Sequence, residues 1–295
     1  MLGAQGRALS LNPLVSVIIP SLDGDRCGSL ARLEAAFKQQ TYTHHEIIVV
    51  VGVSPQGRAI NQGVARARGE VLVILDDDAA VDDPELLGRL VRVLAADAAI
   101  GMAGASVRTP RDAGLFQRLA VREFPRFNVP VVGEITDSDL ACHGCAAFPR
   151  AAFEGVGGER EEIVRGLDPD LRQRLRRAGY RVVLVPDAVV YHPLPANLPR
   201  LLSTFFRNGR GSAFAQAFHP ELVYDTDEQL VRSEALVQPP FAWRLLRFPF
   251  RLLWALLSLR PFRTLAYVAY AAGFAASYPA FLLRRRRQRL TSAAP

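Results

Sequence analysis

Three consecutive carboxylates, Asp76, Asp77 and Asp78, directly follow a short apolar run at 71–75. The run is rich in β-branched residues and too short for a helix, which predicts a strand buried on both faces. The carboxyl ends of strands in open α/β sheets face the ligand crevice, so Asp76 and Asp78 are expected at a ligand site. Carboxylate oxygens suit Mg²⁺ or Mn²⁺, which complete their coordination with substrate phosphates. The alternative is a solvated acidic turn.

Length and composition limit the classes of protein. The chain has 295 residues, a formal net charge of +7 and 49% hydrophobic residues. This is enough for one large α/β domain with appendages, or for two small domains, and it argues against disorder. The positive charge suits nucleic acid, an anionic membrane or a phosphorylated substrate. We expect no nucleic acid, because no binding module is recognisable and the densest Arg run adjoins the most apolar segment.

The three cysteines, at 27, 142 and 145, do not form a disulfide framework, which favours a reducing compartment. Cys142-His143-Gly144-Cys145 has the spacing of half a zinc site, but no second pair exists, so small residues in a strand or tight turn are preferred. Residues 1–13 lack the pattern of a signal peptide. We therefore expect the catalytic part to stay in the cytoplasm.

Hydrophobic patterns predict alternating strands and helices around this acidic turn. Strands are predicted at 15–20 and 46–51, and helices at about 26–39 and 61–68. After the turn, Asp83 is expected to cap a further helix with Pro84 at its first position. Such alternation implies a mostly parallel sheet flanked by helices.

Four segments in this order resemble the N-terminal half of a family-2 glycosyltransferase. They are Val15-Ser-Val-Ile-Ile-Pro20, Glu46-Ile-Ile-Val-Val50, Asn61-x-Gly63-x-x-x-Ala67-x-Gly69 and Leu75-Asp-Asp-Asp78. The resemblance implies a GT-A fold, a nucleotide-sugar donor and inversion at the anomeric carbon. It also implies that Asp76 and Asp78 hold Mn²⁺ or Mg²⁺ with the donor diphosphate, and that Pro20 and Asn61 lie in the donor site.

The second half of the chain extends the similarity to about residues 14–215. The matching segments are Phe148-Pro-Arg-Ala-Ala-Phe153, Val156-Gly-Gly158, Leu167-Asp-Pro-Asp-Leu171, Arg174-Leu175, Gly179-Tyr180 and Pro186-x-Ala188-x-Val190-x-His192. The family's catalytic base falls on Asp168, with Asp170 as the fallback. Inversion is an in-line displacement, in which a carboxylate must take the proton of the acceptor hydroxyl. The alternative for Asp168 is a helix cap, with Pro169 at the first helical position.

Two positions depart from the family pattern. Val51-Gly52 stands where the family has an Asp that reads the nucleobase, and a Val side chain cannot accept a hydrogen bond. The nucleotide of the donor is therefore left open. Asp23 is a candidate for contacting the nucleoside instead, or it forms an Asp-Gly turn. Leu167 replaces the Glu that precedes the base in the family.

Three further residues are candidates for the site. His192 matches a position that lies near the metal in some family members; the alternative is a buried core histidine. Arg207 and Arg210 lie where related enzymes keep a mobile segment that closes on the donor. Their guanidinium groups suit a diphosphate, while a solvated loop is the alternative.

The C-terminal part is predicted to associate with a membrane. Arg residues at 244, 247 and 251 share one helical face opposite apolar residues, a pattern typical of an interfacial helix. An uncharged run at 265–283 is just long enough to span a bilayer, and four Arg residues follow at 284–287. Because a cytoplasmic catalytic domain and the Arg cluster both favour the same side, we prefer an interfacial or re-entrant hairpin to a single span. The alternative is a helical pair packed on the soluble domain.

The predicted organisation is an N-terminal extension (1–13), a GT-A domain (14–220), a linker (221–240), membrane-associated helices (241–290) and a tail (291–295). The predicted function is metal-dependent, inverting transfer of a sugar to a hydroxyl of a lipid-linked or cell-envelope glycan, at the cytoplasmic face of the cell membrane. One alternative is a non-catalytic, membrane-bound scaffold. The other is a sugar nucleotidyltransferase, which needs a basic, Gly-rich loop where Ser21-Leu-Asp-Gly-Asp25 is acidic.

Overall fold

The computed structural model describes residues 8–24, 28–220 and 240–292, and it divides the chain into two compact units. The first unit contains the described residues up to 113 and residues 125–193; the second contains 114–124, 194–220 and 240–292. The predicted linker at 221–239, the predicted helix start at Arg26, and Cys27 lie outside the described residues.

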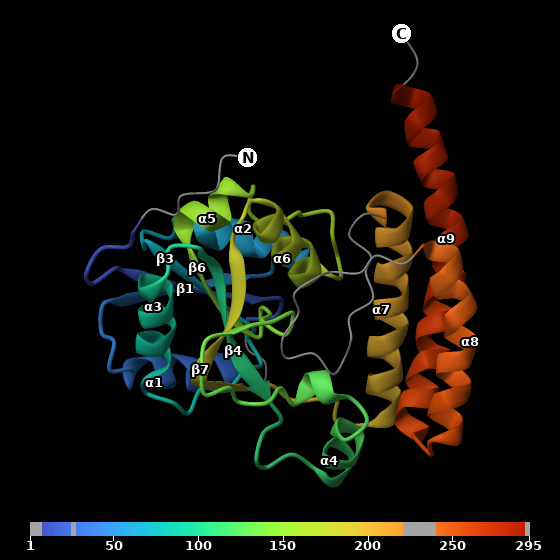
Figure 1. Cartoon of the computed structure of the whole chain (residues 1–295), viewed down its shortest axis with the longest axis horizontal. Helices are drawn as coiled ribbons and strands as arrows, with labels where there is room; N and C mark the ends of the chain where they lie inside the picture. Colours follow the sequence, from blue (N-terminus) through green and yellow to red (C-terminus); the bar gives the residue numbers. More distant parts are fainter. Residues whose placement is uncertain (1–7, 25–27, 221–239, 293–295) are drawn as a thin grey trace. The chain divides into compact units, whose positions relative to one another are not determined.

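The first unit is built on a seven-stranded sheet in the order β2-β1-β3-β6-β4-β7-β5. Five strands run in the same direction, while β5 and β6 run in the opposite direction. The mostly parallel α/β sheet is therefore confirmed (Figure 1). Its strands are β1 (Val15–Ser21), β2 (His45–Val51), β3 (Val71–Leu75), β4 (Ile100–Arg108), β5 (Thr136–Asp137), β6 (Cys145–Pro149) and β7 (Arg181–Tyr191).

Helices cover both sides of this sheet. They are α1 (Ser29–Lys38), α2 (Gln56–Arg66), α3 (Leu86–Ala96), α5 (Arg150–Gly155) and α6 (Leu167–Arg177), with the short 3-10 helix η1 (Pro125–Phe127). The end of α1 contacts the start of α3, because Gln40 accepts a hydrogen bond from the backbone N–H of Leu87. On the other side, α2 lies with α5 and α6 (Figure 1).

The central strand β3 has the predicted bounds, and all five of its side chains are fully buried. It lies between β1 and β6, so apolar side chains are needed on both of its faces. Gly63 of the Asn61-x-Gly63 motif also has a packing reason. A Cβ atom there would lie 2.4 Å from Cγ2 of Ile18, so only glycine lets α2 pack this closely on β1.

Two predicted helix starts are wrong. The helix α2 begins at Gln56 instead of Asn61, so Asn61 lies in the middle of the helix. The helix α3 begins at Leu86, with Glu85 as its N-cap residue. Asp83 instead forms a turn before the helix, in which its Oδ1 accepts a hydrogen bond from the N–H of Glu85. This side-chain turn already pairs the N–H of Glu85. The helix therefore begins after Asp83 and Pro84.

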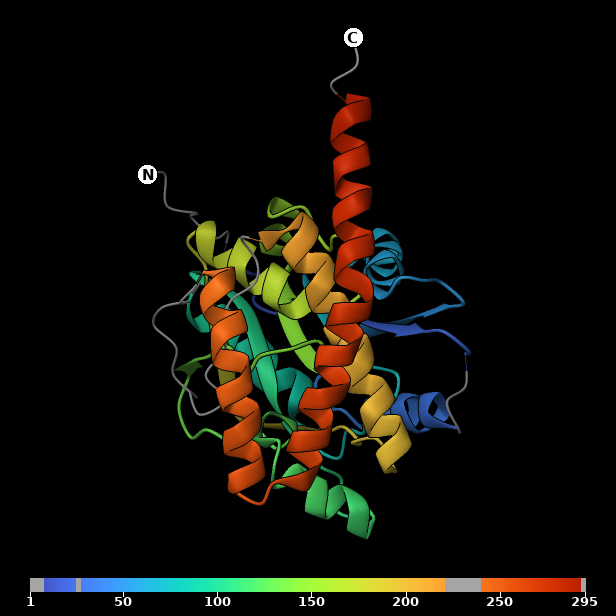
Figure 2. The ribbon, with the colours of Figure 1, turned by 90° about the vertical axis from the view of Figure 1, so that its right-hand side faces the viewer.

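The second unit consists of helices α4 (Leu115–Val121), α7 (Leu198–Phe218), α8 (Phe241–Leu257) and α9 (Pro261–Ser292), seen side-on in Figure 2. The predicted C-terminal helical pair is thus present as α8 and α9. The backbones of α7 and α9 cross very closely at Gly209 and Gly273. A Cβ atom on Gly209 would lie 2.0 Å from the carbonyl oxygen of Tyr270, so no larger residue fits.

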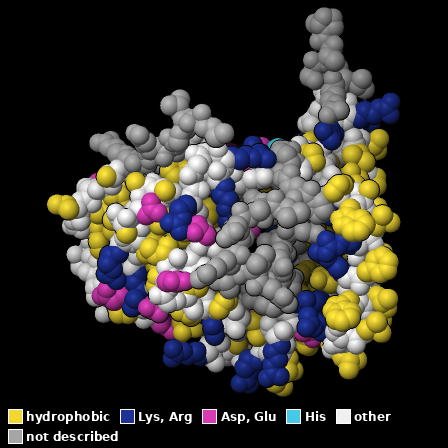
Figure 3. Space-filling model, viewed as in Figure 1, with side chains coloured by type: hydrophobic (Ala, Val, Ile, Leu, Met, Phe, Trp, Pro, Cys, Tyr) yellow, Lys and Arg dark blue, Asp and Glu magenta, His cyan; other side chains and the backbone are white. Residues whose placement is uncertain are grey.

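Large apolar side chains are exposed along α8 and α9. Phe250, Trp254 and Leu257 of α8 are each more than half exposed. Hydrophobic side chains gather on these helices, with Arg side chains between them (Figure 3). Residues 261–288 of α9 are long and apolar enough to cross a membrane by length and composition, and their most apolar stretch of 18 residues has a mean hydropathy of 1.3.

Candidate active site

Three side chains from two strand ends meet at one edge of the sheet. Asp76 and Asp78 follow β3, His192 follows β7, and their ligand atoms all lie within 4.8 Å of one another. Nε2 of His192 lies 2.9 Å from Oδ1 of Asp78 and 3.6 Å from Oδ2 of Asp76. Two carboxylates and an imidazole converging in this way form a set of ligands that suits a divalent cation.

Backbone hydrogen bonds hold the two strand ends together. Ala80 and Tyr191 exchange a pair of N–H···O bonds of 2.7 and 2.9 Å, which joins the turn after β3 to the end of β7. The N–H of His192 also donates to the carbonyl of Arg108 at the end of β4. The imidazole is therefore placed next to the Asp turn by secondary structure.

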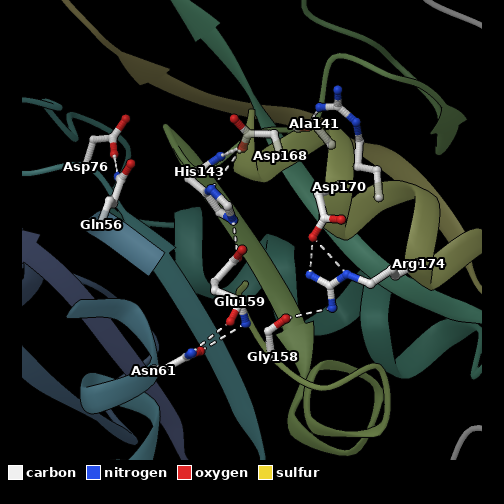
Figure 4. A network of polar contacts seen from close by, with 11 residues as sticks. Gln56, Asn61, Asp76, Ala141, His143, Gly158, Glu159, Asp168, Asp170 and Arg174 are labelled. Atoms are coloured by element: carbon white, nitrogen blue, oxygen red, sulfur yellow. Dashed lines mark hydrogen bonds and ion pairs between the residues drawn. The ribbon is translucent and has the colours of Figure 1, made fainter. Parts of the chain in front are cut away.

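Asp77, the middle carboxylate of the triplet, has a structural contact. Asp77 is buried, and its Oδ2 accepts a 2.7 Å hydrogen bond from the hydroxyl of Ser21 at the end of β1. Asp76 and Asp78 point to the cluster instead. Gln56 of α2 orients Asp76 by donating a 2.9 Å hydrogen bond to its Oδ1 (Figure 4).

The charges within this cluster are strongly coupled. Burial raises the pKa of Asp76, as do the neighbouring charges of Asp78 and Asp168, while His192 acts in the opposite direction. Burial opposes the protonation of His192, but the Asp78 and Asp76 carboxylates more than offset it and raise the pKa of His192 to about 9. A positive charge is therefore favoured between the two carboxylates, and a divalent cation supplies more of it than a proton does.

Asp168 lies in the first turn of α6 and faces the same region. Its side chain is 31% exposed, and its charge contributes to the pKa shift of Asp76. The helix-cap interpretation is wrong, because the N-cap residue is Gly166 in a left-handed conformation. The Asp168 carboxylate instead accepts a 2.6 Å hydrogen bond from the backbone N–H of His143.

Asp170, the fallback base, lies in a different environment. It is buried, and its Oδ2 accepts two hydrogen bonds of 2.6 and 2.8 Å from Arg174 (Figure 4). Arg160 lies 3.2 Å from its Oδ1. Arg174 in turn donates to the carbonyls of Val156 and Gly158. This arrangement ties α6 to the preceding loop, and it favours Asp168 over Asp170 as the residue open to a substrate.

Sequence reasoning missed the importance of His143. The imidazole is buried, with Nδ1 3.1 Å from Oδ1 of Asp168 and Nε2 2.9 Å from Oε1 of Glu159 (Figure 4). The only signal was the Cys142-His143-Gly144-Cys145 spacing. Burial raises the pKa of the Cys142 thiol to about 12 and raises that of Cys145 further, so both remain thiols. Of this motif, the histidine is the residue that contacts Asp168 and Glu159.

The predicted donor residues have different surroundings. Pro20 lies in β1, Asp23 is exposed in the turn after β1, and Val51 at the end of β2 is 53% exposed. The Asn61 side chain contacts the loop after α5, where its Oδ1 accepts from the N–H of Glu159 and its Nδ2 donates to the carbonyl of Glu159.

Arg207 and Arg210 belong to the second unit, within the continuous helix α7. The segment is therefore helical and not the loop of the alternative interpretation, although both arginine side chains are exposed. Gly209, between the two arginines, packs against α9 instead of forming a flexible link. Binding of a donor by these arginines remains a prediction.

Comparisons with known proteins identify a family and a shared fold. The model of the family described as "Glycosyltransferase like family 2" matches residues 13–211. An uncharacterized protein, y4gI, from Sinorhizobium fredii is 26% identical over 236 residues, which cover 61% of this chain. Glycosyltransferase AglD from Haloferax volcanii is 33% identical over 141 residues, covering 44% of this chain. The chain matches only 24% and 21% of the lengths of these two relatives.

A solved structure shares the fold. It is that of the mannosyltransferase PcManGT from Pyrobaculum calidifontis, in complex with GDP-Man and Mn²⁺. The TM-score is 0.60 at 20% sequence identity, and the match covers 91% of this chain and 88% of the other. The similarity confirms a GT-A-like architecture.

Proposed function

The chain belongs to glycosyltransferase-like family 2, and we propose that it transfers a sugar, with inversion, from a nucleotide-sugar donor to an acceptor hydroxyl. The observation that carries this proposal is the placement of an open carboxylate, Asp168, next to the Asp76–Asp78–His192 cluster within one compact unit. The cluster suits the donor diphosphate, which it would bind through a cation. Asp168 suits the acceptor hydroxyl.

We assign Asp76, Asp78 and His192 as the residues that hold Mn²⁺ or Mg²⁺. Bound there, such a cation neutralises the charge that develops on the leaving nucleoside diphosphate. Gln56 fixes the Asp76 carboxylate, while Asp77 anchors the turn to β1 and remains outside the ligand set. The Mn²⁺ and GDP-Man bound to the structurally similar mannosyltransferase support this assignment.

Asp168 is assigned as the general base. Inversion requires the acceptor hydroxyl to attack opposite the leaving group and to lose its proton as the new bond forms. A partly exposed carboxylate at the start of a helix is accessible to such a hydroxyl, whereas the buried, Arg-paired carboxylate of Asp170 is not.

The remaining donor contacts are proposals of the same kind. We keep Pro20, Asp23 and Asn61 as donor-side candidates in the first unit, and Arg207 and Arg210 in the second. Val51 presents an apolar side chain where the family has its nucleobase-reading Asp, so base recognition here relies on packing more than on hydrogen bonds.

A membrane is the proposed location of the acceptor. The exposed apolar side chains of α8 and α9, and the Arg residues at 284–287, suit insertion into an anionic lipid surface. We propose that the enzyme works at the cytoplasmic face of the cell membrane, on a lipid-linked or cell-envelope glycan. Nucleotide sugars and a basic segment are both expected on that side.

The test is turnover of a donor by the purified full-length chain in detergent. UDP-glucose, GDP-mannose and dTDP-glucose are each incubated with Mn²⁺, and release of the nucleoside diphosphate is measured. We expect release from one donor, no release by Asp78→Ala, and a loss of at least about 100-fold in Asp168→Asn, since a general base supplies about 10²–10⁴-fold. Failure of every donor to bind or react would instead favour the non-catalytic scaffold.

A further inference from the structure

We propose that His143, held between the carboxylates of Asp168 and Glu159, is a positioning residue that orients Asp168 to accept the proton of the acceptor hydroxyl. This inference rests on the proposed function, in which Asp168 is the base. No sequence motif or similarity assigned a role to His143 or Glu159.

His143 contacts only one of the two carboxylate oxygens of Asp168. Both the backbone N–H and the ring Nδ1 of His143 approach the same oxygen, Oδ1, at 2.6 and 3.1 Å. Among the described residues, no hydrogen bond is made to Oδ2. One carboxylate oxygen is thus fixed by two donors, and the other is left to take the proton, which is the geometry that a general base needs.

Glu159 is the second carboxylate beside His143, and it matters because both side chains are buried. The side chains of His143 and Glu159 are 4% and 0% exposed, so neither charge is tolerated there without a partner. Burial disfavours the imidazolium, but Asp168 and Glu159 more than compensate and raise the pKa of His143 to about 9. The two carboxylates therefore favour the imidazolium at neutral pH, in which one ring N–H faces each of them.

Glu159 is itself held in place by the fold. Its backbone N–H and carbonyl both bond the side chain of Asn61 in α2, at 2.9 Å each. Gly158, immediately before it, has φ of +62° and lies so close to Asn61 that a Cβ atom would be 3.0 Å from Oδ1. The path from Asn61 through Glu159 and His143 to Asp168 thus joins α2 to the catalytic edge of the unit (Figure 4).

The alternative is a purely structural role, in which His143 only neutralises the charges of Asp168 and Glu159. Positioning through Asp168 differs from this in one measurable respect. If His143 acts on turnover only by orienting Asp168, its removal must cost nothing further once Asp168 has been replaced. A purely structural role lowers activity in both backgrounds.

The first experiment needs no activity. Ring ¹⁵N NMR of the full-length chain in detergent, with ¹⁵N-labelled histidine, follows the protonation of His143 from pH 6 to 10; its signals are assigned by their loss in His143→Gln. We expect a doubly protonated ring at pH 7.5, and a lower pKa in Glu159→Gln and in Asp168→Asn. A ring that titrates near 6.5, or that ignores both substitutions, overturns the proposal.

The second experiment measures release of nucleoside diphosphate from the donor that the wild type turns over, for His143→Gln, Asp168→Asn and the double variant. We expect His143→Gln to lower kcat about 10- to 100-fold, part of the 10²–10⁴-fold effect of a general base, with the donor KM unchanged. In the Asp168→Asn background the same change should alter the residual rate less than about twofold.

Two controls separate the outcomes. His44→Gln, an exposed histidine bonded to the carbonyl of Asn12, should leave kcat unchanged. Near-ultraviolet circular dichroism checks that each variant is folded. Equal losses from His143→Gln with and without Asp168 would contradict the positioning role, whereas absence of any turnover in the wild type would contradict the proposed function itself.

Discussion

Nε2 of His192 lies 2.9 Å from Oδ1 of Asp78, where the end of β7 is joined to the turn after β3. The contact depends on paired backbone hydrogen bonds between Ala80 and Tyr191, so it is built into the sheet. It brings an imidazole next to the two carboxylates of the acidic turn, an arrangement that suits a divalent cation. The assignment of a cation site depends on this relationship.

Replacement of His192 should weaken Mn²⁺ binding. We expect His192→Gln to lower the Mn²⁺ affinity at least about 10-fold, because even residues that merely support a metal ligand contribute 10–100-fold. Isothermal titration calorimetry with Mn²⁺ measures this, with the exposed His44→Gln as the matched control. Equal affinities in the wild type and His192→Gln would remove the histidine from the ligand set.

Asp77 and Asp78 should respond in opposite ways. Asp77→Ala leaves the buried Ser21 hydroxyl without its 2.7 Å acceptor, so we expect a loss of about 1–3 kcal/mol of unfolding free energy and little change in Mn²⁺ affinity. Asp78→Ala should abolish Mn²⁺ binding and change the unfolding free energy by less than about 1 kcal/mol, since its ion pair is partly exposed. Urea denaturation and calorimetry on both variants check the pair of results.

The raised pKa of His143 should make the stability of the fold depend on pH. Its pKa of about 9 in the folded chain lies above the ordinary value of 6.5, so the imidazolium stabilises the fold fully below pH 6.5. This contribution, on the order of 1–3 kcal/mol, is lost as the pH rises through 9. The unfolding free energy of the wild type relative to His143→Gln should therefore fall between pH 6.5 and 9; a difference independent of pH would contradict the ion pairs.

The basic end of α9 should bind anionic lipid. We expect Arg285→Ser and Arg286→Ser each to weaken binding to vesicles containing phosphatidylglycerol roughly fivefold, since each Arg near an anionic surface contributes about 1 kcal/mol. Binding to phosphatidylcholine vesicles should hardly change. Arg66→Ser, an exposed charge on α2 of the first unit, is the matched control in a flotation assay. Equal effects of all three substitutions would remove the specific role of this segment.

Local patterns in the sequence predicted the parts of the fold that depend on local burial. The bounds of β3 came out as predicted, because a run of β-branched residues between turn signals has few other structures available. The resemblance also singled out Asp76, Asp78 and His192, which the structure brings together. Asp77 could not be distinguished from its neighbours, because only the position of Ser21 in three dimensions shows which carboxylate is buried.

Long-range pairing explains what sequence reasoning missed. His143 and Glu159 lie in segments without hydrophobic period, and nothing local indicates that both charges are buried together. Asp83 was expected to cap a helix but forms the turn before it. An Asp side chain can accept a hydrogen bond from a nearby backbone N–H in a helix cap and in a turn, so the sequence did not distinguish the two. A solvated loop was one interpretation of Arg207 to Gly211, whereas these residues belong to the helix α7 and Gly209 is required by the close approach of α9.

The most direct test of the account is a calorimetric titration of the full-length chain in detergent with UDP, GDP and dTDP, each with and without Mn²⁺. The account predicts that one nucleotide binds only when Mn²⁺ is present, and that Asp78→Ala abolishes this binding while Asp77→Ala retains it. Binding that is indifferent to Mn²⁺, or no binding of any nucleotide to the folded wild type, would contradict a cation-held donor at Asp76, Asp78 and His192.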